Sequence, residues 1–297
     1  MSDSSRPYIV AGLAAAGLVG LGYAAAQVLG PRREVKMPPK AVAGVVEPLT
    51  EQELTLKRRI KAHYDDCSPH YQDLWGEHIH HGLWVAGNEG LSKEAAQLAL
   101  VEHMLQLAGL AAGSKVLDVG CGVGGTSNLL AQRGHSLTGV SLSTTQVAMA
   151  KANAAAKGLG PENPRFLEMD GEKLSFPGQD GTFDAVWISE VLSHFPRKNA
   201  FFAHAERLLK PGGKLVLVDW FRADCLGPSM LSSVITDIED GMLLPPMETV
   251  TGYSNLMVAA GLRPVYMQDV SKVRGKAASS SSSSKGKGHG AGVGLPA

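Results

Sequence analysis

The stretch KVLDVGCGVGG, Lys115 to Gly125, decides the fold of this chain. A short apolar run ends in clustered glycines and is followed by a helical pattern over residues 126–133. This order predicts a buried strand, a tight turn and a helix. Gly120, Gly122 and Gly125 match the G-x-G-x-x-G spacing, which lets backbone approach a ligand at the N-terminus of the helix. The spacing alone fits a dehydrogenase equally well.

Four further apolar runs have the length of buried strands, and helical stretches separate them. The strands are expected at residues 136–142, 164–170, 183–189 and 214–220, and the helices at 126–133, 144–157 and 198–210. Two more helices are expected before this region, one starting at the capping box of Thr50 and Glu53 and one capped by Ser92. The alternation predicts an α/β fold with a doubly wound, mainly parallel sheet and a ligand crevice at the carboxyl ends of its strands.

Acidic residues near the glycines indicate which ligand this crevice takes. A dehydrogenase carries an acid about twenty residues after the glycines to bind the ribose hydroxyls. Here the second strand ends in Ser141 and Ser143. Asp118 stands two residues before the first glycine, where a carboxylate can orient a positively charged ligand group, and Asp170 ends the third strand. These features favour a ligand other than a nicotinamide dinucleotide.

Several motifs in the right order resemble those of class I S-adenosylmethionine-dependent methyltransferases: LDVGCGVGG, GVSLSTTQ, MDGEKLSFPGQDGTFDAVW and LLKPGGKLVLVDW. DLWGEHIHHGLW and LLPPM are similar to the γ-tocopherol methyltransferase branch, which is related to alkaloid N-methyltransferases and, more distantly, to sterol C-methyltransferases. The resemblance covers residues 55–270. It implies a Rossmann-like methyltransferase sheet and S-adenosylmethionine as the cofactor.

The resemblance also implies which residues hold the cofactor. The loop after the first strand should cradle the methionine part, Ser141 and Gln146 should contact the ribose and adenine region, and the Asp170 carboxylate should accept from the adenine amino group. The implied set is Asp118, Gly120, Cys121, Gly122, Ser141, Gln146, Asp170 and Gly171. The structural alternatives are a helix cap for Asp118 and helix–sheet packing for Gly124 and Gly125.

Three histidines lie within four positions of GEHIHHGLW, residues 76–84. No cysteine or second acid pairs with this cluster at zinc-ligand spacing, so no metal site is expected. The resemblance implies that the segment folds over the cofactor and faces the acceptor; a surface loop is the alternative. Methylation beside a phenol needs a base for the phenol proton. The candidate catalytic residues are Glu190, His194, His80 and His81; Ser193 stands where many relatives have the acid of a Glu-His pair.

The run from Tyr8 to Leu29 contains no charged residue. A helix of this length spans about 33 Å, enough for a bilayer core. We therefore expect residues 1–30 to form a membrane anchor with a transmembrane helix; a buried Ala/Gly helix is the alternative. Basic residues at 32, 33, 36 and 40 place the rest of the chain on the cytosolic or stromal side. A plastid envelope or the endoplasmic reticulum would be the membrane.

Composition defines the remaining segments. Residues 31–48 are proline-rich and read as a linker, residues 49–274 as the methyltransferase domain, and the Ser/Gly/Lys-rich residues 275–297 as a disordered tail. The tail begins where relatives continue to a final antiparallel strand, so the sheet is expected to lack its last strand and to leave an open edge. The three cysteines lie far apart and form no C-x-x-C pair, which favours free thiols.

The function expected from these observations is methyl transfer to a lipophilic phenol or chromanol of tocopherol type. The alternatives are an N- or C-methyltransferase acting on an amine or sterol, and a catalytically weak cofactor-binding protein. Lys+Arg and Asp+Glu number 28 each, so nothing in the overall charge indicates a nucleic-acid partner. The expected partners are the small-molecule acceptor and the membrane.

Overall fold

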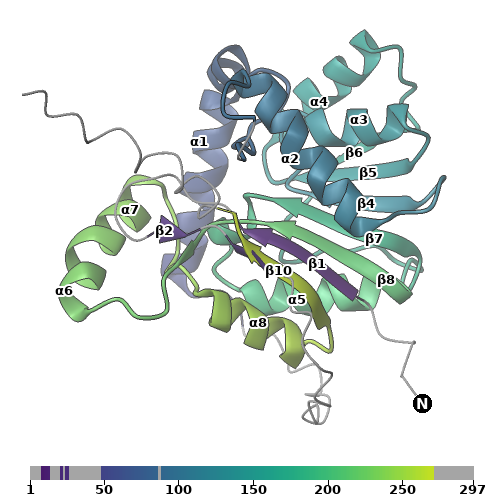
Figure 1. The fold of residues 1–297 in the computed structure, drawn as a ribbon. Coiled ribbons are helices and arrows are strands. Elements are labelled where there is room, and N and C mark those ends of the chain that lie inside the picture. Colours follow the sequence, from purple (N-terminus) through teal and green to yellow (C-terminus); the bar gives the residue numbers. More distant parts are fainter. Residues whose placement is uncertain (1–7, 14–20, 23, 27–47, 86–87, 271–297) are drawn as a thin grey trace, which may run out of the picture.

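The computed structural model describes residues 8–13, 21–22, 24–26, 48–85 and 88–270. It contains one eight-stranded sheet in the order β3-β10-β1-β8-β7-β4-β5-β6 and a two-stranded sheet of β2 and β9 (Figure 1). The strands are β1 (Tyr8–Leu13), β2 (Leu21–Gly22), β3 (Ala24–Ala26), β4 (Lys115–Val119), β5 (Ser136–Ser141), β6 (Arg165–Glu168), β7 (Phe183–Ser189), β8 (Leu209–Val218), β9 (Phe221–Arg222) and β10 (Arg263–Asp269).

Helices precede and connect the strands. They are α1 (Glu51–Trp75), α2 (Lys93–Ala108), α3 (Gly125–Gln132), α4 (Thr144–Ala156), α5 (Lys198–Leu208), α6 (Pro228–Met230), α7 (Thr236–Gly241) and α8 (Val250–Ala259), with a π turn at Leu231–Ile235 and a short 3-10 helix at Leu192–His194. The expected capping box of Thr50 and Glu53 is present, and the Ser92 side chain caps α2. The predicted α/β fold is confirmed, although α1 continues to Trp75, well beyond the end expected near Tyr64.

Both faces of the sheet are covered, which explains the continuous apolar runs of the strands. Side chains alternate between the two faces. Leu117, Val186 and Leu215 pack with Phe201 and Tyr253 of α5 and α8. Val116, Trp187 and Val216 pack with Leu100 and Leu130 of α2 and α3. The helices therefore lie above and below the strands, as Figure 1 shows.

The connections between strands fix where a ligand can bind. From β4 the chain moves outward to β5 and β6, then returns to β7 on the other side of β4, and all four strands are parallel. Strand order therefore reverses between β4 and β7. In open α/β sheets the crevice at the carboxyl ends of such strands is the ligand site. Gly120 follows β4 at this point, and Glu190 follows β7.

The prediction of a transmembrane helix near the N-terminus is not supported. The described residues of the apolar run are in the short strands β1, β2 and β3, and the rest of the run lies outside the described residues. β1 pairs in parallel with β8 on one side and with β10 on the other. Its backbone groups thus find hydrogen-bond partners in the sheet. No helix among the described residues is both long and apolar enough to cross a membrane.

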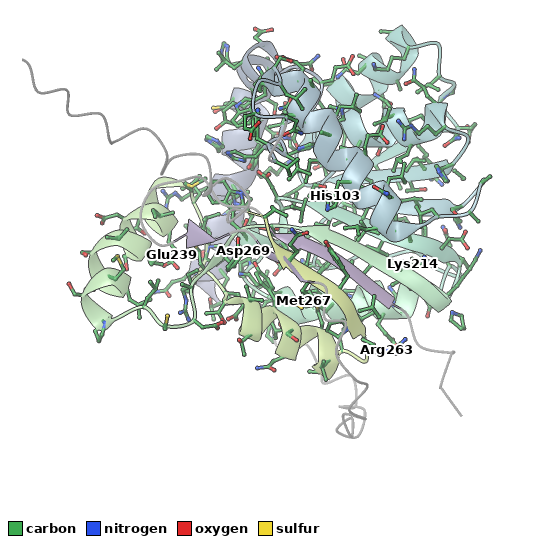
Figure 2. The ribbon with its side chains drawn as sticks, in the orientation of Figure 1. His103, Lys214, Glu239, Arg263, Met267 and Asp269 are labelled. Atoms are coloured by element: carbon green, nitrogen blue, oxygen red, sulfur yellow. The ribbon has the colours of Figure 1, made fainter. Side chains whose placement is uncertain are left out.

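The chain after Val270, where the final strand was expected to be missing, lies outside the described residues, but the open edge expected beside β8 is not found. The position beside β8 is filled by β1, and β10 follows it (Figure 1). β10 in turn pairs antiparallel with β3, so this side of the sheet is not left as a bare edge at β8. Figure 2 marks β10 by its labelled residues Arg263, Met267 and Asp269. The predicted linker, apart from Pro48, and the predicted tail lie outside the described residues.

Candidate active site

Three neighbouring cavities open at the carboxyl ends of β4 to β7. The first, of about 110 Å³, lies between α1 and the strand ends. The second, of about 30 Å³, lies between the glycine turn after β4 and the histidine loop, residues 76–84. The third, of about 170 Å³, lies beyond the histidine loop toward α7. His80 lines the second and third cavities, and Glu190 lines the first and third.

The glycine turn needs conformations and space that side chains would remove. Gly120 and Gly122 have φ values of 73° and 53°, in the left-handed region. A Cβ on Gly120 would overlap the side chain of Val191. A Cβ on Gly122 would meet no atom within 4 Å, so that position faces open space in the first and second cavities. The turn therefore presents bare backbone to whatever occupies them.

Asp118 lies beneath this turn. Its side chain is buried and accepts a hydrogen bond from the Ser127 hydroxyl of α3 at 2.6 Å. Burial raises the pKa of the Asp118 carboxyl to about 6, although the Ser127 bond acts in the opposite direction. The alternative that Asp118 serves only as a helix cap does not fit, because the α3 cap is Gly124 without a side-chain bond. The carboxyl lines the second cavity, where a positive group would stabilise its ionised form.

Ser141 and Gln146 line the first cavity, as expected of the β5 end. The Ser141 hydroxyl donates to Gln146 Oε1 at 2.7 Å. The sequence did not reveal that α1 brings Asp65 to the end of β5. Asp65 Oδ1 accepts from the Ser143 hydroxyl at 2.6 Å and from the Thr145 backbone at 3.2 Å, and so caps α4. Cys121, another expected site residue, places its buried side chain against Phe166 and Val147. Cys121 also lines the second cavity.

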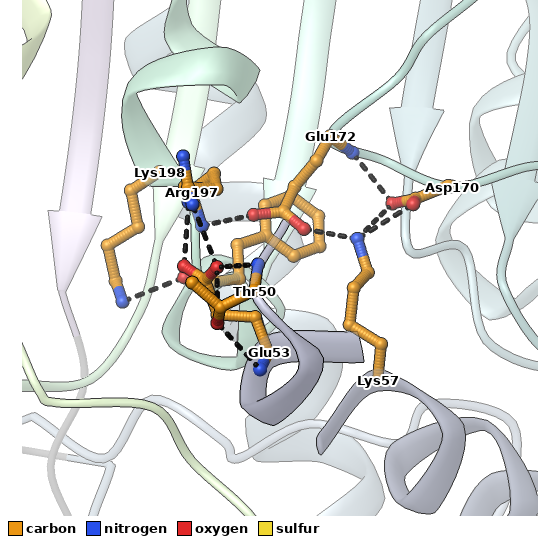
Figure 3. Close-up of polar contacts among 8 residues, drawn as sticks. Thr50, Glu53, Lys57, Asp170, Glu172, Arg197 and Lys198 are labelled. Carbon is orange, nitrogen blue, oxygen red and sulfur yellow. Dashed lines mark hydrogen bonds and ion pairs between the residues drawn. The ribbon is translucent and has the colours of Figure 1, made fainter. Parts of the chain in front are cut away.

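Asp170 and Gly171 line the first cavity, but Asp170 already has a partner that the sequence did not reveal. Lys57 of α1 donates to both Asp170 oxygens at 2.7 Å and pairs with Glu172 (Figure 3). Burial raises the pKa of Glu172 even though Lys57 acts in the opposite direction. Lys57, Ile60 and Tyr64 recur at helical spacing and all line this cavity, so α1 forms its cover.

The start of α1 is tied to α5 by a second ion pair. Arg197 donates from Nε to Glu53 Oε1 at 2.6 Å and from Nη2 to Glu53 Oε2 at 2.8 Å. Glu53 simultaneously completes the capping box with Thr50 (Figure 3). The hydrogen bond from Arg197, foremost, lowers the pKa of Glu53 to about 2. The position of the cover thus depends on contacts between residues far apart in sequence.

The histidine loop is held from below by α2. Gln97 donates from Nε2 to the carbonyls of His78 at 2.6 Å and His80 at 2.9 Å. Leu83 N donates to Ala96 O at 2.8 Å, and a Cβ on Gly82 would overlap Ala96. Above, the loop touches α3 so closely that a Cβ on Gly125 would overlap the Glu77 carbonyl. Gly125 is therefore required for contact with this loop, so the alternative of helix–sheet packing alone does not describe it.

His81 and Glu190 come together at the wall of the third cavity. Glu190 Oε2 accepts from His81 Nδ1 at 2.7 Å, and Oε1 accepts from the His81 backbone at 2.9 Å. Trp220 Nε1 adds a bond to Oε2 at 3.2 Å. Burial alone would raise the pKa of Glu190, but the bonds and charge of His81 lower it. Burial alone would lower the pKa of His81, but Glu190 raises it.

His194 has different neighbours. Its Nε2 lies 2.9 Å from the Tyr64 hydroxyl, and its Nδ1 lies 3.4 Å from the Leu243 carbonyl. A carbonyl only accepts, so Nδ1 carries the proton and Nε2 accepts from Tyr64. Burial lowers the pKa of His194 to about 4. Ser193, which stands where many relatives have an acid, uses its backbone N–H to bind the buried Asp219 at 3.2 Å.

Comparison with known proteins shows the family to which this site belongs. A family described as methyltransferase domain matches residues 117–217. A tocopherol O-methyltransferase of Arabidopsis thaliana is 31% identical over 234 residues, covering 73% of this chain and 66% of that protein. The 27-O-demethylrifamycin SV methyltransferase of Amycolatopsis mediterranei is 31% identical, covering 70% of this chain and 75% of the relative. The chain belongs to the class I S-adenosylmethionine-dependent methyltransferases.

Relatives named for tocopherol and for 2-methyl-6-phytyl-1,4-hydroquinone methylation are 31% to 35% identical to this chain. The chain spans less than two thirds of the length of the tocopherol methyltransferases that it matches. A geranyl diphosphate C-methyltransferase from Streptomyces coelicolor A3(2), solved with S-adenosyl-L-homocysteine, has the same fold. It is 19% identical with a TM-score of 0.56, and the match covers 74% of this chain and 80% of that one.

The cofactor of the family is S-adenosylmethionine, and the residues at the strand ends fit it. The glycine turn offers open backbone at Gly122, and Asp118 offers a buried carboxyl for a cationic group. The ring atoms His78 Nδ1 and His80 Nε2 are buried without a hydrogen-bond partner among the described residues. The described residues contain no group of three or more His, Cys, Asp or Glu side chains arranged for a metal ion.

Proposed function

We propose that this methyltransferase transfers a methyl group from S-adenosylmethionine to a lipophilic phenol or chromanol of tocopherol type, and that His81 is the general base. The observation that carries the proposal is the His81–Glu190 pair in the wall of the third cavity. The relatives named for tocopherol support this class of acceptor. The methionine part of the cofactor would bind at Asp118, Gly120, Cys121 and Gly122, and the adenosine part at Ser141, Gln146, Asp170 and Gly171.

The third cavity suits an aromatic, apolar acceptor. Its lining combines aromatic and thioether side chains with a few polar groups. The residues are Tyr64, Tyr71, Trp75, Ile79, His80, His81, Glu190, Ser193, His194, Trp220, Met242 and Leu244. Rings from both sides touch His81: the centroids of Trp75 and Trp220 lie 5.2 and 5.1 Å from its ring centroid. A flat ring with one hydroxyl could pack against these side chains while the hydroxyl meets His81.

Glu190 prepares His81 for proton transfer. Because Nδ1 donates to the carboxylate, the lone pair of the neutral ring is on Nε2, and no described residue bonds that atom. Glu190 stabilises the imidazolium that forms when Nε2 takes the hydroxyl proton. His194 is less suited, because Tyr64 occupies its accepting nitrogen. Bound S-adenosylmethionine supplies an electrophilic methyl group. Deprotonation leaves the acceptor with the electron pair that forms the new bond to this methyl group.

The test is transfer of labelled methyl groups from S-adenosylmethionine to a panel of chromanols, sterols and amines, with wild-type and His81→Asn protein. Transfer to a chromanol, lost in the variant, supports the proposal. Transfer to an amine or sterol supports the alternative acceptors. Cofactor binding with no transfer to any member supports a catalytically weak protein.

We further infer a plastid as the compartment, because two of the relatives are named as chloroplastic proteins. A fluorescent protein fused to the C-terminus should co-localise with chlorophyll autofluorescence in plant cells. An even cytosolic signal would contradict this assignment.

A further inference from the structure

His80 is buried beside the glycine turn with one ring nitrogen unused. Its side chain is 6% exposed and lines the second cavity together with Asp118 and Gly122. Nδ1 lies 2.8 Å from the His81 carbonyl, whereas Nε2 has no partner among the described residues. An unpartnered buried polar atom is costly, so a native cavity that keeps one is expected to complete it with a ligand.

The tautomer of His80 follows from its neighbour. A carbonyl oxygen only accepts hydrogen bonds, so the Nδ1 of His80 must carry a proton. Burial lowers the pKa of His80, which keeps the ring neutral. The free Nε2 is therefore an acceptor and requires a ligand atom that donates.

The second cavity holds another acceptor, the buried Asp118 carboxyl. Within the described part of the chain, its side-chain donor is the neutral Ser127 hydroxyl alone, and no cation pairs with it. Glu77 also lines the cavity, but it is largely exposed and its Oε1 pairs with Lys157 at 2.7 Å. His78 also lines the cavity, and its buried Nδ1 likewise has no partner among the described residues. Of the groups left for a ligand, the Asp118 carboxylate and His80 Nε2 are the two fixed as acceptors. A primary ammonium group, which carries only donors and a positive charge, complements both.

We propose that His80 is a specificity residue for the α-ammonium group of the cofactor, accepting a hydrogen bond at Nε2 while Asp118 supplies the opposite charge. The inference rests on the proposed function only in that S-adenosylmethionine is the bound cofactor. The proposed contact gives the histidine loop a role in recognising the amino-acid end of the cofactor. The role is separate from that of His81, whose ring meets Glu190.

Two substitutions separate the two nitrogens of His80. His80→Asn keeps a donor near Nδ1 and removes the acceptor at the Nε2 position, whereas His80→Gln keeps an acceptor near Nε2. The ligands are S-adenosylhomocysteine and its analogue in which hydrogen replaces the α-amino group. Calorimetry would measure both affinities for each protein. The desamino analogue serves as the control for folding, because it does not meet the proposed contact.

The expected result is that His80→Asn weakens S-adenosylhomocysteine roughly 10- to 100-fold and leaves the desamino analogue unchanged. His80→Gln should stay within about threefold of wild type for both ligands. Equal weakening of both ligands would mean that His80 only supports the loop. An unchanged preference for the amino group, with a raised KM for the acceptor, would assign Nε2 to the acceptor instead. Either outcome overturns the proposal.

The same titrations distinguish this inference from the proposed reaction. If the wild-type protein prefers the ligand with the amino group but methylates no phenol, the proposed reaction is refuted and the ammonium site stands. If the wild-type protein methylates a phenol and His80→Asn keeps the wild-type preference for the amino group, the reaction stands and the ammonium site is refuted.

Discussion

Glu190 holds His81 at two atoms, the backbone nitrogen at 2.9 Å and ring Nδ1 at 2.7 Å. Glu190 itself has a φ of 54°, a conformation that is unfavourable for a residue with a side chain. Strain of this kind persists where the surroundings impose it and concentrates at functional sites. The strained turn after β7 therefore directs one carboxylate toward the loop that covers the glycine turn.

This pair gives a prediction for the pH dependence of turnover. The pKa of His81 is raised by Glu190, so the neutral base forms only as pH rises above the ordinary imidazole range near 6.5. The rate at saturating substrates should increase with pH through this pKa. In Glu190→Gln the charge is lost and burial dominates, so the inflection should move to lower pH. Rate profiles of the two proteins check this; an identical inflection would exclude His81 as the titrating base.

The roles of the histidines can be separated by kinetics. His81→Asn should lower kcat by about 10²- to 10⁴-fold, because it removes the proposed base. Affinity for S-adenosylhomocysteine should stay near wild type, which serves as the control for an intact cofactor site. A variant with normal kcat would transfer the role to Glu190 or His194.

Lys57 is expected to matter more than another lysine on the same helix. In Lys57→Met, Asp170 and the buried Glu172 lose their cation, and breaking a buried pair costs about 3 kcal/mol of unfolding free energy. Lys61→Met is the matched control, because Lys61 and its partners Asp65 and Glu168 are all partly exposed and such pairs contribute less than about 1 kcal/mol. Urea unfolding of the three proteins measures the difference.

The sign of the pH effect in Lys57→Met also follows. Glu172 already has a pKa raised by burial, and losing the cation would raise it further. A raised folded-state pKa means that the folded protein holds the proton more tightly, so stability falls as pH rises through that value. The cost of Lys57→Met should therefore be larger at pH 8 than at pH 5. Equal costs at both pH values would mean that Glu172 stays neutral or exposed.

The sequence predicted the parts of the fold and site that are local. The glycine turn, the ends of α2 and the capping box depend on residues within a few positions of one another, where spacing carries the information. Asp118 and Gly120 are predicted in this way. The positions of Lys57 and Tyr64 depend on partners more than a hundred residues away, Asp170 and His194. In the sequence, the one signal for these two residues is their helical spacing with Ile60, which places all three on one face of α1.

Two features could not be read from local pattern. The Gly/Ala-rich run that contains β1 has no alternation, so its apolar character fits a helix as well as a strand. Its pairing partners β8 and β10 decide the outcome. The adjacent histidines likewise look equivalent in sequence. Gln97 from α2 and Glu190 from β7 hold the loop so that His80 and His81 have different partners.

Gly120 provides a test of the glycine turn. A Cβ there would overlap Val191, which lines the first cavity, and the left-handed φ adds backbone strain. Gly120→Val should weaken S-adenosylhomocysteine at least tenfold, about 1.4 kcal/mol, by calorimetry. Gly134→Ala is the control for strain alone, since Gly134 has a φ of 86° with nothing within 4 Å of a Cβ. Unchanged affinity in a folded Gly120→Val protein would remove the turn from the cofactor site.

The final prediction concerns the contribution of β1 to the stability of the sheet. Its backbone pairs with β8 through Tyr8 to Ala11 and with β10 through Tyr8 to Leu13. A chain that begins at Val35 would leave the facing edges of β8 and β10 without this strand, and unpaired edges promote association with other chains. We expect the shortened protein to unfold at lower temperature and to aggregate more than the full chain, as scanning calorimetry and light scattering would measure. A shortened protein with the same unfolding temperature and full binding of S-adenosylhomocysteine would contradict the placement of β1 in the sheet.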